Sequence, residues 1–291
     1  SGNIDDLVIT AGNTTETISF KPTDDSVYEG DETATISIDS VSGGEASENG
    51  KQAVTITINE NESAPTVTLS VSASSIAENS GSTLTITATS SIVADENITV
   101  GISTSGTATE GTDYGTISDI TITAGNTTGT ATFDPTDDSI SDVAETAIVA
   151  ISSVSGADAT ESGSQSVTIT INDNEATPTV TLTVSATSIA ENAGSSLTIT
   201  ATLSGATDED VTVGIDTAGT ATEGTDYTDG SGNLDDITIS AGSTTGTVSF
   251  TPSDDSGDPV YEENETAIIS IGSVSGGGAS ENGSQSVTIT I

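Results

Sequence analysis

Long strings of residues recur along the chain in a fixed order, and this repetition limits the possible fold more than any other feature of the sequence. GTATEGTDY begins at Gly106 and again at Gly219, and VTITI begins at Val54, Val167 and Val287. Shorter strings such as SIAEN and SVSG recur between these landmarks in the same order. Such recurrence indicates tandem copies of one folding unit.

The recurring strings divide the chain into a first unit (residues 1–64), a second unit (65–177) and a third unit (178–291). The first matches only the second half of a unit, so it lacks about four strands and cannot bury its own apolar face. We therefore expect the sequence to be a window from a longer tandem array. The alternative is that another chain donates the missing strands. The third unit lacks the acidic segment that closes the second, so its site is expected to be incomplete.

Within a unit, most segments alternate between apolar and polar residues with a period of two. In the second unit these segments are residues 66–71, 84–87, 98–102, 120–122, 130–133, 147–151 and 167–171. β-Branched residues in this pattern, bounded by Gly, Asn and Asp, are typical of half-buried strands. No stretch shows helical spacing. Seven strands in roughly 110 residues predict an immunoglobulin-like sandwich. The predicted fold is all-β, with such sandwiches arranged end to end.

The composition excludes several classes of function. The chain has 45 acidic residues, only two Lys and Arg together, no His and no Cys, and a net charge of −43. Nucleic acid and anionic membranes are excluded as partners because both need a cationic face. No apolar run is long enough for membrane insertion. Without His, Cys or Arg the reactive groups are carboxylates and hydroxyls, and the 2% of aromatic residues offer no sugar platform. We predict that the chain is not an enzyme.

The acidic residues of the second unit fall at places that an antiparallel sandwich brings together. The connections after strands one, three and five, and the exit from strand seven, lie at one pole. The acids there, which we call the acidic pole, are Glu78, Asp113, Asp137, Asp138, Asp142, Glu145, Asp173 and Glu175. Two carboxylates 4 Å apart repel by about 4 kcal/mol at an effective dielectric constant of 20. The two lysines both lie in the first unit.

A cation among these carboxylates would remove the repulsion. Hard oxygen ligands without nitrogen or sulfur favour Ca²⁺, which takes six to eight oxygens in flexible geometry, over Mg²⁺, which keeps its waters. The alternative is a solvated, salt-adapted acidic surface. The convergence of four separate acidic places on one pole favours calcium.

These motifs resemble the Calx-beta family, the calcium-binding sandwich of sodium–calcium exchangers and of many large bacterial surface proteins. The family has a Glu after the first strand, the pattern A-T-x-G-x-D-Y, a D-D pair followed by two acids, and a terminal acidic run. The resemblance implies that the acidic pole binds calcium near the junction with the next domain. It extends this role to Asp24, Asp25, Glu29, Glu32 and Glu60 in the first unit, and to Glu191, Asp226, Asp254, Asp255, Glu262 and Glu265 in the third.

The sequence departs from the family pattern in its terminal acidic runs and in one loop, and Ala34, Ala147 and Ala267 stand where the family often has Phe. The terminal run is NENE in the first unit and NDNE in the second, which lowers the ligand charge. Three extra residues lengthen the loop between Asp255 and Glu262.

The resemblance and the acidic pole together indicate an extracellular calcium-binding structural repeat, as on bacterial surfaces. We expect a calcium-rigidified stalk or fibre segment of a surface, adhesion or filament protein. Its partners would be neighbouring repeats of the same chain or identical subunits of a fibre. Two alternatives stay open. The Thr-rich outward strand faces could bind glycan or ice, or the chain could assemble laterally into a filament by strand complementation.

Overall fold

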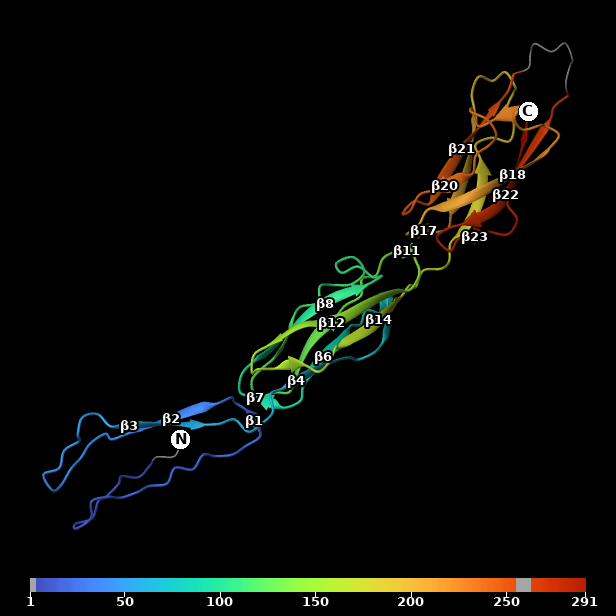
Figure 1. Cartoon of the computed structure of the whole chain (residues 1–291). Coiled ribbons are helices and arrows are strands. Elements are labelled where there is room, and N and C mark those ends of the chain that lie inside the picture. The colour runs from blue at the N-terminus through green and yellow to red at the C-terminus, as the bar shows by residue number, and fades with distance from the viewer. Residues whose placement is uncertain (1–3, 255–262) are drawn as a thin grey trace.

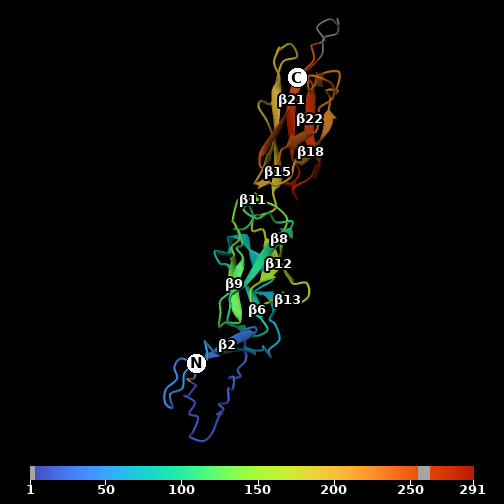
Figure 2. The same ribbon diagram turned by 60° about the vertical axis from the view of Figure 1, so that its left-hand side comes forward.

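The computed structural model describes residues 4–254 and 263–291 as a row of three units placed end to end (Figures 1 and 2). The predicted all-β fold is confirmed. Within the described residues the only helix is η1 (Glu78–Ser80), a single 3₁₀ turn. No helix in these residues has the length and apolar character needed to cross a membrane.

The second unit is a sandwich of two sheets. Its strands are β4 (Thr66–Val71), β5 (Ser75–Ala77), β6 (Leu84–Ser90), β7 (Val93–Ala94), β8 (Ile98–Gly106), β9 (Ile120–Ile122), β10 (Thr128–Phe133), β11 (Ile140–Ser141), β12 (Glu145–Ser155), β13 (Thr160–Glu161) and β14 (Ser166–Asn172). One sheet has the order β10-β6-β4-β13 and the other the order β5-β14-β12-β8-β9. All seven predicted segments lie within strands, namely β4, β6, β8, β9, β10, β12 and β14.

The strand directions place the acidic loops at one end of this sandwich. β4 and β10 are both antiparallel to β6, so they run the same way. β8 and β14 are both antiparallel to β12, and β5, which continues the direction of β4, is parallel to β14. The ends of β4, β8, β10 and β14 therefore lie at one pole, as predicted.

The inward residues of both sheets form one apolar core. Val67, Ile86 and Ile169 are fully buried, and the ring of Tyr114 stacks on that of Phe133 with centroids 4.8 Å apart. Tyr114 is the last residue of the first GTATEGTDY copy and is 1% exposed. The repeated string thus ends on a core aromatic, which attaches the loop before it to the sandwich.

The third unit repeats this architecture around a separate core, in which Tyr227 stacks on Phe250 at 4.6 Å. Its sheets have the orders β19-β21-β16-β15-β23 and β20-β18-β22-β24. The strands are β15 (Thr179–Val184), β16 (Leu197–Leu203), β17 (Ala206–Thr207), β18 (Val211–Gly219), β19 (Tyr227–Thr228), β20 (Ile237–Ile239), β21 (Thr245–Pro252), β22 (Thr266–Ser275), β23 (Ser280–Glu281) and β24 (Ser286–Thr290).

Within residues 4–64 the first unit has three strands and no apolar core. β2 (Glu32–Ser37) and β3 (Ala53–Ile58) form a hairpin, and β1 (Val27–Tyr28) reaches the second unit. No residue between 4 and 64 is buried. Residues 7–9 and 15–20 form no strand, since their counterparts β9 and β10 pair with β8 and β6, which have no counterpart here. The exposed large apolar residues of this unit are Ile4, Leu7, Val8, Ile9, Ile18, Phe20, Ile38, Val41 and Val54.

Short parallel ladders join consecutive units, a feature that the sequence did not predict. At the first junction β1 pairs with β7, Tyr28 lying opposite Ala94. At the second junction β11 pairs with β17, Ser141 lying opposite Thr207. The acidic pole of one unit therefore faces the opposite pole of the next, as Figure 1 shows near the labels β11 and β17.

Candidate metal site at the second junction

A parallel ladder within the second unit brings the first and last acidic places together. β5 pairs with β14, and Ala77 lies opposite Asn172. The next residues along the two segments are Glu78, which opens η1, and Asp173. The end of the first strand and the exit of the last therefore present their carboxylates side by side.

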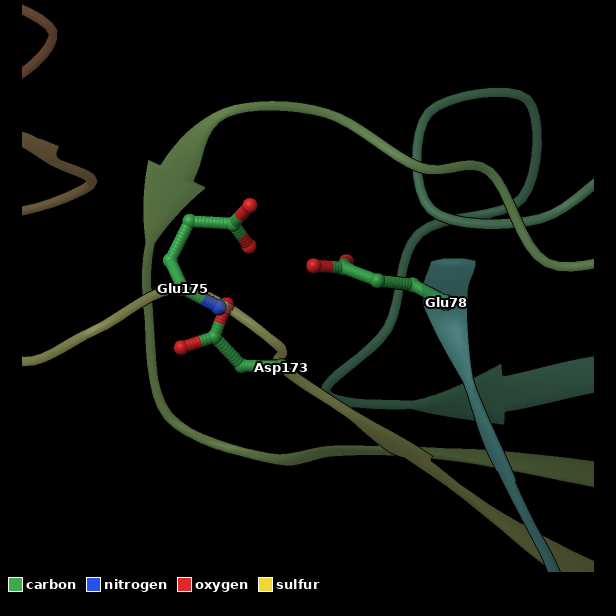
Figure 3. Close-up of side chains that lie close together, drawn as sticks. All are labelled: Glu78, Asp173 and Glu175. Atoms are coloured by element: carbon green, nitrogen blue, oxygen red, sulfur yellow. Dashed lines mark hydrogen bonds between the residues drawn. The ribbon is translucent and has the colours of Figure 1, made fainter. Parts of the chain in front are cut away.

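Glu78, Asp173 and Glu175 form a compact group (Figure 3). One carboxylate oxygen of each lies within 4.8 Å of the others. Glu78 Oε1 and Glu175 Oε2 are buried and have no hydrogen-bond donor. Burial, followed by the nearby Glu175 carboxyl, raises the pKa of Glu78 to about 8. Two buried oxygens without donors are the feature expected of a site that a cation completes.

Asp113 and Glu145 form a second part of the pole. Asp113 Oδ2 accepts the backbone N–H of Thr109 at 2.6 Å, which fixes the loop after β8. Glu145 is the first residue of β12 and lies opposite Ile171 near the end of β14. Burial and the adjacent Asp113 carboxylate raise the pKa of Glu145 to about 7.

Asp142 links these two parts of the pole. Burial raises its pKa to about 6, with further contributions from the charges of Asp173, Asp208, Asp138 and Asp113. Asp138 Oδ1 accepts the N–H of Ile140 at 2.7 Å and so shapes the approach to β11. The remaining predicted residue of this set, Asp137, is exposed beside Asp138.

Glu110, the other acid of the repeated nonapeptide, has a different role. Glu110 accepts the hydroxyl of Thr104 at 2.7 Å and the N–H of Ile117 at 3.1 Å, and thereby braces the loop from inside. Glu223 makes the equivalent bonds to Thr217 and Leu234 in the third unit. Within GTATEGTDY the Glu holds the loop while the Asp faces the pole.

The donor set of this pole fits a hard divalent cation. It consists of carboxylates from four separate segments, two of whose oxygens are buried without donors, and it includes no nitrogen or sulfur ligand. Such oxygen-only sets suit Ca²⁺ or Mg²⁺ rather than Zn²⁺ or copper. The raised pKa values of Glu78, Asp142 and Glu145 likewise indicate that no positive charge in the part of the chain that the structure describes lies near these carboxyls.

The predicted acids of the first unit are arranged differently. Glu60 accepts backbone N–H groups from Glu29, Gly30, Asn61 and Glu62 at 2.6–2.9 Å. These bonds, that from Glu62 first, lower the pKa of Glu60 to about 2. The other predicted acids also lie in loops or at a strand start: Asp24 accepts the Asn61 side chain, Asp25 accepts the N–H of Val27, Glu29 follows β1, and Glu32 opens β2.

In the third unit the predicted acids are only partly brought together. Glu191 and Asp254 line the same groove, of about 260 Å³. Asp226 accepts the N–H of Thr222, as Asp113 does with Thr109. Glu265 exchanges two backbone hydrogen bonds with Ile291. Asp255 and Glu262 lie outside the described residues.

The sequence did not place Asp208 at the site, although its charge acts on both Asp142 and Glu145. Asp208 belongs to the third unit and precedes β18. Its counterpart in the second unit is Asp95, on the pole opposite the predicted site. The available signal was the short segment between β14 and β15, residues 173–178, which leaves little distance between the two poles.

The fold and the acidic pole together define a tandem array of sandwich domains with clustered carboxylates at the junctions. The profile of the Calx-beta domain matches residues 2–62, 60–175 and 173–291. The chain therefore belongs to the Calx-beta family, as the sequence motifs indicated. No curated protein sequence matches the chain at a significant level.

Several solved structures are distantly similar. CBD12 from CALX1.2 is 16% identical, with 69% of this chain and 77% of that chain covered and a TM-score of 0.32. Invasin, a bacterial integrin-binding protein, is 17% identical, with 78% and 39% covered and a TM-score of 0.36. The adhesin InvE of Yersinia pseudotuberculosis is 15% identical, with 77% and 58% covered and a TM-score of 0.32.

Proposed function

We propose that the chain is a calcium-rigidified segment of an extracellular stalk or fibre. The observation that carries this proposal is the group of Glu78, Asp173 and Glu175, whose oxygens converge with two of them buried and without donors. Calcium would be held by these residues together with Asp113, Asp142 and Glu145. We place the chain outside the cell, where extracellular calcium-binding modules bind calcium in the submillimolar to millimolar range.

Binding at this position would serve stiffness and stability together. The site lies where the exit of β14 meets the ladder between β11 and β17, so an ion there fixes the segment that connects two sandwiches. An ion that binds only the folded state stabilises it by about 2.7 kcal/mol at 100 times its dissociation constant. A chain with a net charge of −43 has strong self-repulsion for that ion to offset.

Thermal unfolding of the whole chain tests the proposal. We expect a large rise in Tm in millimolar calcium relative to chelator, and a much smaller rise with magnesium. The double variant Glu78→Gln, Glu175→Gln keeps the shape but removes the charge. It should melt higher than the parent in chelator and gain little from calcium. Glu96→Gln, at the opposite pole of the same unit, serves as the matched control and should respond to calcium like the parent. An equal Tm in calcium and chelator for the parent would refute the proposal.

A second candidate function rests on the outward Thr faces. In the sheet β10-β6-β4, strand register aligns Thr128 with Thr89 and Thr68, and Thr130 with Thr87 and Ser70. The sheet β21-β16-β15 repeats the grid with Thr245, Thr202 and Thr181, and with Thr247, Thr200 and Thr183. None of these six strands contains a charged residue. Hydroxyls and methyls thus form a regular array with a strand spacing of about 4.8 Å.

Such an array would bind a periodic hydroxyl-bearing surface, with ice as the simplest case. The test is the fraction of protein retained in slowly grown ice for the parent and for the double variant Thr87→Lys, Thr200→Lys. Thr99→Lys, on the other sheet of the second unit, is the matched control. Retention that the central Lys substitutions abolish would support this function. Exclusion of the parent from ice would remove ice as the ligand, and insoluble glycans would be tested with the same variants.

A further inference from the structure

The ladder at the second junction places a carboxylate of the third unit beside the acidic pole of the second. β11 and β17 are parallel, with Ser141 opposite Thr207. The residues that follow in register are Asp142 and Asp208. Thr207 is fully buried and Ser141 is 8% exposed. The ladder residues are therefore shielded from solvent.

The surroundings give Asp208 no protein cation to face. The two Lys residues of the chain, at positions 21 and 51, lie in the first unit. The pole that Asp208 approaches already holds two buried oxygens without donors, Glu78 Oε1 and Glu175 Oε2. The Asp208 carboxylate is close enough to Asp142 and Glu145 to repel both. Placing the Asp208 carboxylate beside these carboxylates costs electrostatic free energy unless a cation lies between them.

The first junction repeats the arrangement independently. Tyr28 lies opposite Ala94, and the next residues in register are Glu29 and Asp95. The N–H of Asp95 donates to the carbonyl of Tyr28 at 3.1 Å, which fixes the register at that point. Two junctions with different ladder residues thus bring an acid of the following unit to the acidic end of the preceding one.

We propose that Asp208 is a calcium ligand supplied by the third unit to the site of the second, so that a single site is shared across the junction. This inference rests on the proposed calcium function. The ion then ties two domains together directly instead of stiffening only the linker between them. Removal of the ion leaves Asp208 facing Asp142 with like charge, which opens the junction and frees the angle between the units.

The test uses the whole chain and the variant Asp208→Asn, with Asp95→Asn as the matched control at the first junction. Calcium titration by calorimetry gives the affinity of each class of site, and small-angle X-ray scattering gives the radius of gyration with and without calcium. We expect Asp208→Asn to weaken one class of site by roughly tenfold or more and to abolish the calcium-dependent change in the radius of gyration caused by that site. Asp208→Glu should retain part of the calcium affinity and part of the calcium-dependent change in the radius of gyration. Asp95→Asn should leave the affinity of this class of site unchanged.

The outcomes separate the two proposals. If the parent chain takes up no calcium, the proposed function fails and this inference fails with it. If the parent binds calcium and Asp208→Asn binds it with the same affinity, only the shared site is overturned. The Tm of Asp208→Asn in chelator checks folding, and it should equal or exceed that of the parent because a repulsive charge has been removed.

Discussion

The exit segments of the first and second units have nearly the same sequence but treat their carboxylates in opposite ways. In NENE, residues 59–62, Glu60 accepts four backbone N–H groups. In NDNE, residues 172–175, Asp173 accepts one N–H at 3.2 Å, and Glu175 Oε2 has none. Backbone N–H groups lower the pKa of Glu60 to about 2, whereas burial and then the Glu175 carboxyl raise the pKa of Glu78, beside Asp173, to about 8.

The difference shows that an acidic cluster is not by itself evidence for a metal. A carboxylate surrounded by backbone N–H groups is already stabilised as an anion. Carboxylates that face one another without donors are stabilised only by protons or by a cation. This criterion supports the ion proposed for the acidic pole of the second unit and gives no support for one at Glu60 of the first.

The largest expected effect that tests this difference between the two units is the pH dependence of the Tm in chelator. A carboxyl whose pKa is raised by folding stabilises the protein below its unfolded value, and that stability is lost as the pH rises to the folded value. For Glu78, Glu145 and Asp142 this window extends from about pH 4 to about pH 8. We expect the Tm of the second unit to fall by roughly 5–10 °C across it. Millimolar calcium should remove most of the fall.

Glu60 has the opposite sign, because its pKa is lowered from 4.5 to about 2. Its contribution is present above pH 4.5 and is lost as the pH falls through 2. Hydrogen exchange at the N–H groups of Glu29 and Gly30 should therefore stay slow from pH 5 to pH 8 once corrected for intrinsic rates.

The control for the second unit is the Glu78→Gln, Glu175→Gln variant, whose Tm should depend less on pH than that of the parent. A parent Tm that rises with pH in chelator would contradict the raised pKa values of Glu78, Glu145 and Asp142.

A smaller effect is expected from a substitution in the turn that packs against the ladder strand, because this turn differs between the second and third units. In the second unit Ala157 has a left-handed backbone with a φ of 50°, and the residue at the ladder position is the small, buried Ala94. In the third unit the counterparts are Gly277 and Thr207, and a Cβ on Gly277 would lie 2.7 Å from the Thr207 Cβ. Gly277→Ala should therefore destabilise the third unit by roughly 2–3 kcal/mol.

The rescue variant is Thr207→Ala combined with Gly277→Ala, which copies the pair of the second unit. Denaturant unfolding of the whole chain should show the loss in the transition of the third unit and its partial recovery in the double variant. Equal destabilisation by the single and double variants would mean that the strained backbone, and not the contact with Thr207, carries the cost.

The sequence was sufficient for the strands and for the convergence of the acidic loops, because both follow from local alternation and antiparallel direction. It was not sufficient for the junctions. The β11–β17 ladder depends on how two domains meet, and a two-residue strand such as Ile140–Ser141 leaves no periodic signal. The different surroundings of Glu60 and Glu175 could not be inferred either, since hydrogen bonding to backbone N–H groups is set by loop conformation rather than by residue type.

The smallest expected effect concerns a contact that only the first junction has. The hydroxyl of Tyr28 donates to Asp158 Oδ2 across the junction at 2.9 Å, and its ring packs against the core of the second unit. The counterparts at the second junction, Ser141 and Gly278, cannot form this bond. Tyr28→Phe removes the hydroxyl and keeps the ring, so it should weaken the first junction only slightly.

The measurement is protease cleavage near residues 60–65 compared with cleavage near 173–178, in calcium and in chelator. Tyr28→Phe should increase cleavage modestly at the first junction under both conditions and leave the second unchanged. Chelator should act mainly at the second junction, where Glu78 Oε1 and Glu175 Oε2 are buried without donors. If Tyr28→Phe raised cleavage at both junctions alike, the hydroxyl would be supporting the second unit as a whole, and the two junctions would not be held together by different means.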